Sequence, residues 1–236
     1  MKAVIQAGGK GTRLAPYTLV LPKPMMPVGD QPVIEILLKW LRRNNTQEAV
    51  ITTGHLAHII QSFCGDGSQW DMGISYCQEP EPLGTVGALK LIEDQLTETF
   101  LMLNGDLITD LDLMAFKRAH EESGALLSIA TTNKQVYIDF GVIETENNSV
   151  TAFKEKPNFP MKVSMGLYII APEVLTYIPK GVPFGFDNLM HALLEKGLPV
   201  NTYNHEGEWM DIGRVEDFKQ AQKDWADRHE KTMLGV

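Results

Sequence analysis

The sequence predicts an α/β protein whose mixed, mainly parallel sheet is covered by helices on both faces. In the first half of the chain, short apolar runs alternate with segments whose apolar residues recur at helical spacing. This alternation is typical of a parallel sheet, because each crossover between parallel strands needs a helix. Segments rich in glycine and carboxylates directly follow two of the apolar runs, as is typical of a ligand-binding sheet edge.

The first half of the chain supplies the parallel part of the sheet. Its expected strands are Ala3–Ile5, Ala49–Thr53, Ile74–Cys77 and Phe100–Leu103. Its expected helices are Val33–Arg43, Ala57–Phe63, Val86–Gln95 and Leu113–Glu122. Because parallel strands end at one edge, the loops after Ile5 and Leu103 should lie together.

After residue 122 the pattern changes to a mixed or antiparallel extension of the sheet. The expected strands are Leu126–Thr131, Phe140–Thr145, Val150–Phe153 and Val163–Ile170, with a hairpin turn at Asn147-Asn148. Helices are expected again at Phe186–Glu195 and Val215–Trp225, and the polar residues 227–236 are expected to fray. No linker interrupts the pattern, so we expect one domain over residues 1–236.

Composition excludes several classes of function. A formal net charge of −9 argues against nucleic-acid binding, which needs a basic face. No stretch approaches the roughly 20 apolar residues of a membrane span, and the first residues are interrupted too early for a signal peptide. Cys64 and Cys77 lack neighbouring ligands and are expected to be reduced thiols. The sequence therefore predicts a cytoplasmic protein that does not contact a membrane.

The segment Gly8–Arg13 is typical of a phosphate-binding loop. Its glycines let backbone N–H groups converge on anionic oxygens, and Arg13 and Lys23 add cations suited to a triphosphate. The segment lacks the Gly-Lys-Ser/Thr ending of a P-loop and the third glycine of the dinucleotide fingerprint. It therefore indicates a nucleotide loop of a different kind.

Two carboxylates from distant segments are candidate metal ligands. Asp106 and Asp211 each follow an apolar stretch, and hard oxygen ligands completed by phosphates are what Mg²⁺ requires. Alternatively, Asp106 caps the following turn and Asp211 caps the helix expected near Val215.

Two further motifs have both a functional and a structural interpretation. Gly84 would permit close approach of a flat base, and Thr85 would cap the helix that follows, so a simple capping turn is the alternative. Lys156 would meet a sugar phosphate and Glu155 would accept sugar hydroxyls, but Glu155-Lys156-Pro157 alone is also a common end of an edge strand.

Taken together, these motifs resemble the sugar-1-phosphate nucleotidyltransferases, also called NDP-sugar pyrophosphorylases, from residue 1 to about 222. The motifs are Gly8–Leu14, Pro22–Pro24, Pro82–Thr85, Asn104–Asp106, Glu155–Pro157, Gly166–Tyr168 and Trp209–Gly213. The resemblance implies a Rossmann-like, glycosyltransferase-A-like α/β/α sandwich. It also implies that an NTP and a sugar 1-phosphate are converted to an NDP-sugar and pyrophosphate with Mg²⁺.

The resemblance also implies a role for each matching residue. Arg13 and Lys23 would be catalytic, Arg13 on the departing pyrophosphate and Lys23 on the α-phosphate and the sugar phosphate. Asp106 and Asp211 would hold the metal. The nucleotide would contact Gly8, Gly9, Gly11, Thr12, Arg13, Glu79, Gly84 and Thr85, and the sugar phosphate would contact Gly141, Glu155, Lys156 and Gly166.

On the same resemblance, residues 1–122 would mainly bind the nucleotide and residues 123–222 mainly the sugar. A homo-oligomer is the default expectation. The chain is expected to be a catalytic domain alone, without the β-helix of some relatives.

The nucleotide and the sugar are less closely specified. Gln6 stands where the family usually has an apolar residue, and Ser164-Met165-Gly166 replaces a more common Asn-x-Gly. GTP with a mannose- or heptose-type sugar is the preferred pair, and uridylyl, thymidylyl or cytidylyl transfer to another sugar 1-phosphate is left open. Two classes of protein remain as rivals, a metal-dependent glycosyltransferase and a non-catalytic nucleotide-sugar-binding homologue.

Overall fold

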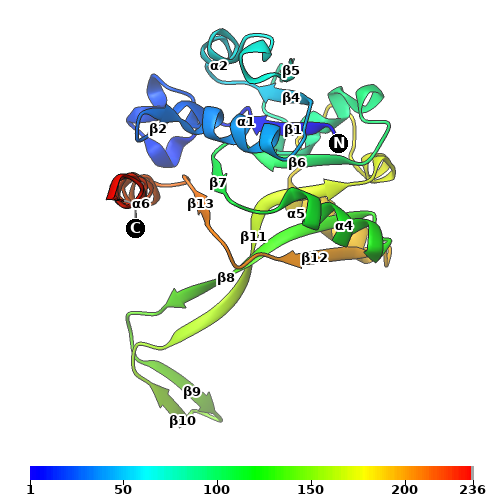
Figure 1. The fold of residues 1–236 in the computed structure, drawn as a ribbon. Helices are drawn as coiled ribbons and strands as arrows, with labels where there is room; N and C mark the ends of the chain where they lie inside the picture. The colour runs from blue at the N-terminus through cyan, green and yellow to red at the C-terminus, as the bar shows by residue number, and fades with distance from the viewer. Residues whose placement is uncertain (235–236) are drawn as a thin grey trace.

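A seven-stranded sheet with helices on both faces forms the body of the protein (Figure 1). The computed structural model describes the backbone of residues 1–234 and the side chains of residues 1–226. The strand order is β12-β8-β11-β6-β1-β4-β5. Its strands are β1 (Ala3–Ala7), β4 (Glu48–Thr53), β5 (Gly73–Gln78), β6 (Phe100–Asn104), β8 (Leu127–Tyr137), β11 (Asn158–Ile170) and β12 (Val200–Asn204).

The sheet is mainly parallel, as the sequence predicts. Strands β6, β1, β4 and β5 are parallel neighbours, and β12 pairs in parallel with β8. Strand β11 is antiparallel to both β6 and β8, so it joins the two parallel groups. The expected α/β class with a mixed sheet is therefore confirmed.

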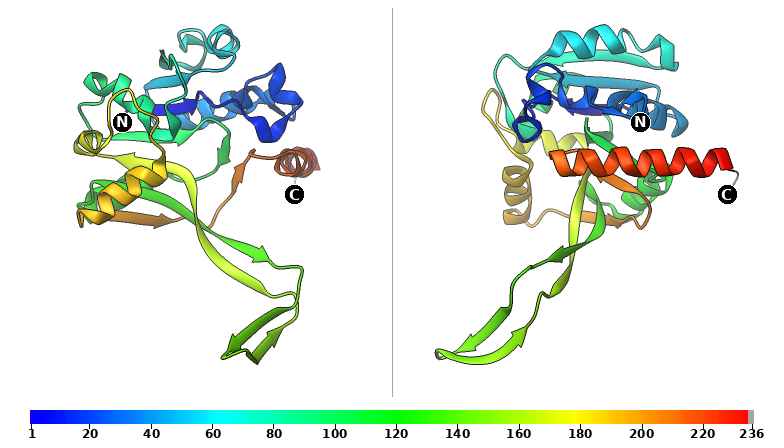
Figure 2. Two further views of the ribbon diagram at one scale, coloured as in Figure 1. Left: turned by 180° about the vertical axis from the view of Figure 1, so that it is seen from behind. Right: turned by 90° about the vertical axis from the view of Figure 1, so that its left-hand side faces the viewer.

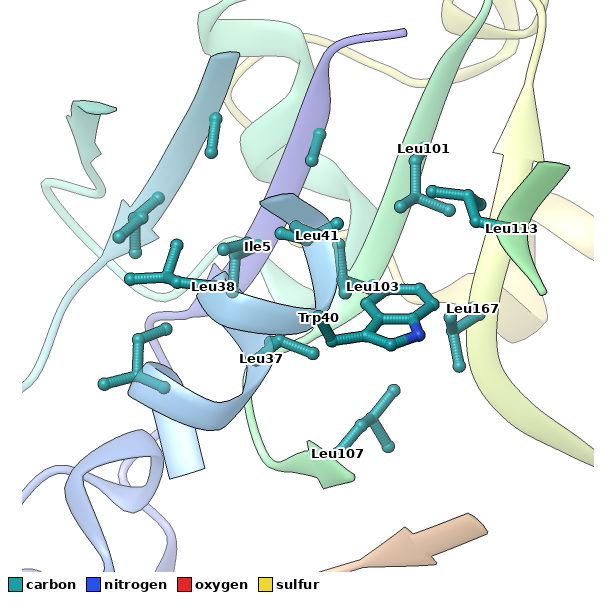
Figure 3. Close-up of a cluster of buried hydrophobic side chains, with 14 of the residues drawn as sticks. Ile5, Leu37, Leu38, Trp40, Leu41, Leu101, Leu103, Leu107, Leu113 and Leu167 are labelled. Carbon is teal, nitrogen blue, oxygen red and sulfur yellow. The ribbon is translucent and has the colours of Figure 1, made fainter. Parts of the chain in front are cut away.

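Alternate residues of the central strands fill one core on each face of the sheet. Ile5 and Leu103 point to the face covered by α1 (Val33–Arg43), where Trp40 donates its indole N–H to the Leu111 carbonyl at 3.1 Å (Figure 3). Val4 and Met102 point to the other face, which α5 (Phe186–Glu195) helps to cover. This two-sided burial explains why the central strands are continuous apolar runs.

Most of the expected helices form within a residue of their predicted bounds. Helices α1 and α5 have the predicted bounds, and α2 (Ala57–Cys64) and α4 (Leu113–Ser123) are each one residue longer. Helix α6 (Val215–Leu234) passes the predicted end and runs through the tail expected to fray from Asp227. Residues 235–236 of that tail lie outside the described residues.

The helix expected over Val86–Gln95 is wrong. That stretch consists of the short α3 (Gly84–Gly87) and two 3₁₀ turns, Ala88–Leu91 and Glu93–Gln95. The Phe184 carbonyl accepts from the backbone N–H groups of Val86 and Gly87, at 3.1 and 3.2 Å, so a neighbouring segment fixes the first turn. Two glycines within four residues also favour a break over a regular helix.

Several short elements lack a periodic signal and were not expected. They are the hairpin pair β2 (Pro27–Val28) and β3 (Gln31–Pro32), the antiparallel pair β7 (Leu107–Thr109) and β13 (Trp209–Asp211), and β12 at the sheet edge. None of the described helices is long and apolar enough to cross a membrane.

Residues 133–162, which we call the arm, leave the body as a twisted ribbon (Figures 1 and 2). The outer parts of β8 and β11 form its stem, and β9 (Val142–Glu146) and β10 (Ser149–Lys154) form its tip. The predicted turn at Asn147-Asn148 is confirmed, since both residues have the positive φ that a tight hairpin turn requires. The strand expected from Phe140 begins at Val142 instead, because the chain bends at Phe140, whose side chain is exposed.

Candidate active site

A cavity of about 300 Å³ opens at the carboxyl ends of β1 and β6. The segments after β1, β5 and β6 meet there, so the predicted convergence of the loops after Ile5 and Leu103 is confirmed. The lining residues are Gln6, Ala7, Gly8, Gly9, Lys23, Pro24, Glu79, Pro82, Gly84, Thr85, Asn104 and Asp106.

Two glycines of the loop after β1, Gly8 and Gly11, lie where a side chain would not fit. A Cβ atom on Gly8 would overlap the carboxylate of Glu79. Gly11 has a φ of +62°, in the left-handed region, and its carbonyl accepts from the Thr18 hydroxyl at 2.8 Å. Gly8 and Gly9 line the cavity with backbone, as a phosphate-binding loop should.

Thr12 and Arg13 lie at the exposed rim of the loop, in a 3₁₀ turn spanning Thr12–Leu14, and do not line the cavity. The Arg13 guanidinium is still close enough to Lys23 to lower the pKa of that ammonium. Arg13 therefore lies outside the cavity lining but within electrostatic reach of Lys23.

Lys23 is the charged centre of the site. Its ammonium pairs with the carboxylate of Asp106, and its Nζ lies 3.8 Å from Asp211 Oδ1. Burial lowers the pKa of Lys23 and Arg13 adds to this effect, whereas Asp211 and Asp217 oppose it. The partly buried cation thus lies between two opposite charges.

The pairing of β7 with β13 brings the two distant carboxylates together. Asp211 lies opposite Leu107 in this pair, and the Ile212 N–H donates to the Asp106 carbonyl at 3.1 Å. Asp106 and Asp211, which are more than a hundred residues apart in the sequence, therefore both lie beside the Lys23 ammonium.

The two carboxylates fit a magnesium ion. Asp106 is buried, and Asp211 Oδ1 is a buried oxygen without a hydrogen-bond partner among the described residues. No cluster of three or more His, Cys, Asp or Glu residues with metal-binding geometry occurs in the described part of the chain. Two carboxylates suffice for Mg²⁺, which keeps waters and takes phosphate oxygens from its substrate.

The far end of the cavity is formed by Glu79, Gly84 and Thr85. Burial raises the pKa of Glu79, and the Leu83 N–H, which donates to its carboxylate at 2.9 Å, opposes this rise. Gly84 has a φ of +76°, and a Cβ there would lie 2.8 Å from the Phe184 carbonyl. Thr85 is not a helix cap, because Leu83 holds that position; its hydroxyl instead faces the Phe186 N–H at 3.4 Å.

Gln6 and Asn104 also line the cavity, although sequence analysis predicts no role for them. The Gln6 side-chain carbonyl accepts from the Thr52 hydroxyl at 2.9 Å. Its amide nitrogen is buried and has no partner among the described residues, so it can donate to a ligand. The sequence offered one sign of such a role for Gln6, which stands where the family that the chain resembles usually has an apolar residue.

The four residues expected to bind the sugar phosphate are divided between two places. Gly166, with a φ of +75°, lies against Asn104 at the cavity side. Gly141 and Glu155 are neighbours near the tip of the arm, where Lys156 pairs with Asp139 at 2.7 Å. The structure therefore groups these three with one another and not with the cavity.

Residues 2–228 match the family model described as nucleotidyl transferase. The chain belongs to the nucleotidyl transferase family. Among its curated relatives, it is 36% identical to a UTP–glucose-1-phosphate uridylyltransferase of Synechocystis, with 94% of this chain and 62% of the relative covered. It is 31% identical to a mannose-1-phosphate guanylyltransferase of Mycobacterium tuberculosis, with 94% and 64% covered. This nucleotidyl transferase chain thus spans about three fifths of the length of these relatives.

Solved structures show the same nucleotidyl transferase fold. A putative glucose-1-phosphate thymidylyltransferase from Bacillus anthracis in complex with a sucrose superposes with a TM-score of 0.78 at 25% identity, covering 96% of each chain. HddC from Yersinia pseudotuberculosis complexed with GMP-PN superposes with a TM-score of 0.74 at 23% identity, covering 95% of this chain and 99% of the other. The fold expected from the sequence is confirmed by both.

Proposed function

We propose that the protein transfers a nucleotidyl group from an NTP to a sugar 1-phosphate and releases pyrophosphate. The observation that carries this proposal is the Lys23 ammonium, held between Asp106 and Asp211 beside a glycine loop in a cavity of nucleotide-binding size. A buried cation, two metal-binding carboxylates and backbone N–H groups at one point are what a phosphoryl centre needs.

The chemistry follows from these groups. An oxygen of the sugar phosphate attacks the α-phosphorus, and the bond from that phosphorus to the bridging oxygen breaks, so pyrophosphate leaves with the electron pair. The nucleophile is already an anion and needs no general base, which fits a site built of cations and glycines. Lys23 would orient the attacking oxygen against the α-phosphate, while the Gly8–Arg13 loop neutralises the departing charge.

Asp106 and Asp211 would hold Mg²⁺, which supplies charge neutralisation at the phosphates when bound. The Lys23 ammonium pairs with the Asp106 carboxylate, and its Nζ lies 3.8 Å from Asp211 Oδ1. We therefore expect Lys23 to exchange these partners for phosphate oxygens as the substrates bind.

Glu79 supports GTP as the preferred nucleotide. Guanine presents two adjacent donors, N1–H and the N2 amino group, and a carboxylate can accept from both at once. Uracil and thymine offer only N3–H, so Glu79 would be less well matched to either base. Relatives named as mannose-1-phosphate guanylyltransferases support GTP and a mannose-type sugar.

Uridylyl transfer is the second candidate, because the Synechocystis relative at 36% identity is named as a uridylyltransferase. The deciding experiment measures pyrophosphate release with Mg²⁺, each of GTP, UTP, dTTP and CTP, and a panel of sugar 1-phosphates. Release that needs both substrates supports the proposal, and the best pair identifies the nucleotide and the sugar.

The same experiment separates the other classes of protein. A glycosyltransferase would release no pyrophosphate from an NTP. A non-catalytic homologue would bind nucleotide without turnover, and folded protein that stays inactive with every pair would contradict the proposed activity.

A further inference from the structure

The arm carries an unusual share of the exposed apolar side chains. Seven of the thirteen large hydrophobic residues that are exposed in the described chain lie on it, although the arm is only residues 133–162. They are Val136, Tyr137, Phe140, Ile143, Val150, Phe153 and Met161. At roughly 100 Å² of exposed apolar surface each, they amount to about 700 Å² per copy, close to the about 800 Å² that each partner buries in a standard interface.

The arm is also the electrically neutral part of an acidic protein. Its four lysines balance its four carboxylates, whereas the whole chain has a formal charge of −9. Two bodies of this charge repel one another, so a neutral apolar ribbon is where two copies can meet at least electrostatic cost. An isolated two-stranded hairpin such as β9–β10 is marginally stable in water, so it too favours a covering partner.

The arm cannot deliver its own polar residues to its own cavity in this conformation. From Leu167, which pairs with β6, the strand β11 runs nine residues outward to Asn158, about 30 Å at the usual rise. Lys156 lies beyond that point, and β8 pairs with β11 as far as Tyr137, so the stem does not fold back. The cavity thus contains predicted nucleotide-binding residues such as Gly8, Glu79 and Gly84 but lacks Glu155 and Lys156.

We propose that the protein is a dimer in which each arm packs on the partner subunit and supplies Glu155 and Lys156 to the partner's active site. This inference rests on the proposed sugar-phosphate role of these two residues. It explains in one arrangement why the tip is apolar and why it bears the sugar-phosphate residues so far from Lys23. The occupant of the arm's apolar surface is accordingly a second copy of this chain.

Purified heterodimers test the exchange directly. One subunit carries Lys23→Ala and the other Lys156→Ala, each with a different affinity tag, so that tandem purification isolates the mixed dimer. Each homodimeric variant should lose roughly 10- to 100-fold or more in turnover, because each removes a charged contact to phosphate. If the arms are exchanged, the heterodimer contains one intact site and recovers about half of the wild-type activity per dimer, an estimate that treats the two sites as independent.

The reciprocal heterodimer is the matched control. A subunit with both Lys23→Ala and Lys156→Ala, paired with a wild-type subunit, has no intact site if the arms are exchanged and one intact site if they are not. Residual activity in the first heterodimer and half activity in the second would overturn the proposal. It would leave the nucleotidyl transfer itself untouched.

A measurement without substrates separates this inference from the proposed function. Sedimentation should show a dimer for the wild type and for Leu194→Asp, an exposed apolar position on α5, but a monomer for Phe140→Asp on the arm. A wild type that stays monomeric at micromolar concentration would overturn the arm exchange even if the enzyme is fully active.

Discussion

At the scale of single residues, the site contains polar and charged groups that the fold removes from water. Lys23 is a partly buried cation, Glu79 is a partly buried carboxylate, and Gln6 has a buried amide nitrogen with no partner among the described residues. Each has a free-energy cost in the folded protein that a ligand can offset. These costs are the physical basis of the residue-level predictions.

Lys23→Ala should lower kcat by on the order of 30- to 1000-fold, about 2–4 kcal/mol, because it removes a charge directed at the transferring phosphate. The loss should persist at saturating concentrations of both substrates, since it concerns the transition state rather than binding. Steady-state kinetics check this. Lys39→Ala is the control, because Lys39 forms a surface pair with Glu35 on α1 and should leave turnover unchanged. Unchanged turnover in Lys23→Ala would refute the assignment.

Glu79→Gln should weaken the preference for GTP and change its pH dependence. Because burial raises the pKa of Glu79, this carboxyl takes up its proton at a higher pH than an ordinary glutamate. Lowering the pH therefore removes its charge early, and kcat/KM for GTP in the wild type should fall with it. In Glu79→Gln this acidic limb should move to lower pH, and in the exposed neighbour Glu81→Gln it should not.

The effect of Glu79 on folding stability should have the opposite pH dependence from its effect on kcat/KM: lowering the pH should favour the folded state. Its charged form is disfavoured in the folded state, so this group destabilises the fold above its raised pKa and the effect fades as pH falls through it. Glu79→Gln should thus be at least as stable as the wild type near neutral pH in urea unfolding. A clear loss of stability would show that the carboxylate serves the fold and not the nucleotide.

Sequence reasoning could single out Lys23, Asp106 and Asp211, which the structure brings together, because each belongs to a local motif next to an apolar run. It missed a role for Gln6 and Asn104, since lining a cavity depends on three strands meeting. It placed Glu155 and Lys156 with the sugar, and that assignment stays a prediction whose geometry depends on the arm.

At the scale of elements, local signals and tertiary contacts compete. Helix α4 begins at a local signal: Asp112 accepts the Ala115 N–H at 2.9 Å as its N-cap. Segment Gly84–Gly87 is shaped by Phe184 instead, and there the periodicity of apolar residues predicted the wrong element. The periodicity of apolar residues indicates which face of a segment is buried. It carries no information about a hydrogen bond to a distant group such as the Phe184 carbonyl.

Asp112→Ala should lower the free energy of unfolding by about 1 kcal/mol, the usual value of an N-cap. Activity should not change, because α4 lines no part of the cavity. Urea unfolding followed by circular dichroism measures the loss, and Asp112→Asn, which can still cap, should restore most of it. A loss of activity in folded Asp112→Ala would contradict this separation of α4 from the site.

Gly84→Ala should impair nucleotide binding more than it impairs stability. The new methyl group meets the Phe184 carbonyl at 2.8 Å and a φ of +76°, so the segment that closes the far end of the cavity must shift. Gly197→Ala is the matched control, because its φ is also positive, at +63°, but open space surrounds its Cβ. Calorimetric titration of nucleotide should show weakened binding for the first variant alone.

At the scale of the whole molecule, an early segment of the chain packs against a late one beside the phosphate-binding loop. Leu14 and Met26 share a small core with Ile212 and Ala221, and the Tyr17 ring contacts Phe218 with centroids 5.8 Å apart. Helix α6 thereby holds the segment that contains Lys23. The sequence predicted the sheet and most helices, because the spacing of apolar residues reflects which side chains are buried. It could not predict the arm or the packing of α6 on residues 14–26, which we call the clamp, because both depend on long-range packing.

Gln222→Ala should lower both stability and turnover. Its side chain accepts from the Gly29 N–H at 3.0 Å and donates to the Pro27 carbonyl, so α6 would lose two bonds to the segment after Lys23. The expected cost is about 1–3 kcal/mol of stability. Gln220→Ala should change neither quantity, because among the described side chains Gln220 donates to Asp224 within α6.

The clamp of α6 also sets the order in which the protein can become active during its synthesis. Gln222 is separated from Pro27 by 195 positions, so the ribosome makes the Lys23 segment long before the helix that fastens it. The first half of the sheet can begin to collapse as it emerges, but closing so long a loop is a late event. A nascent chain would therefore hold a folded sheet with a loose phosphate loop, and nucleotide turnover would begin only after α6 had left the exit tunnel.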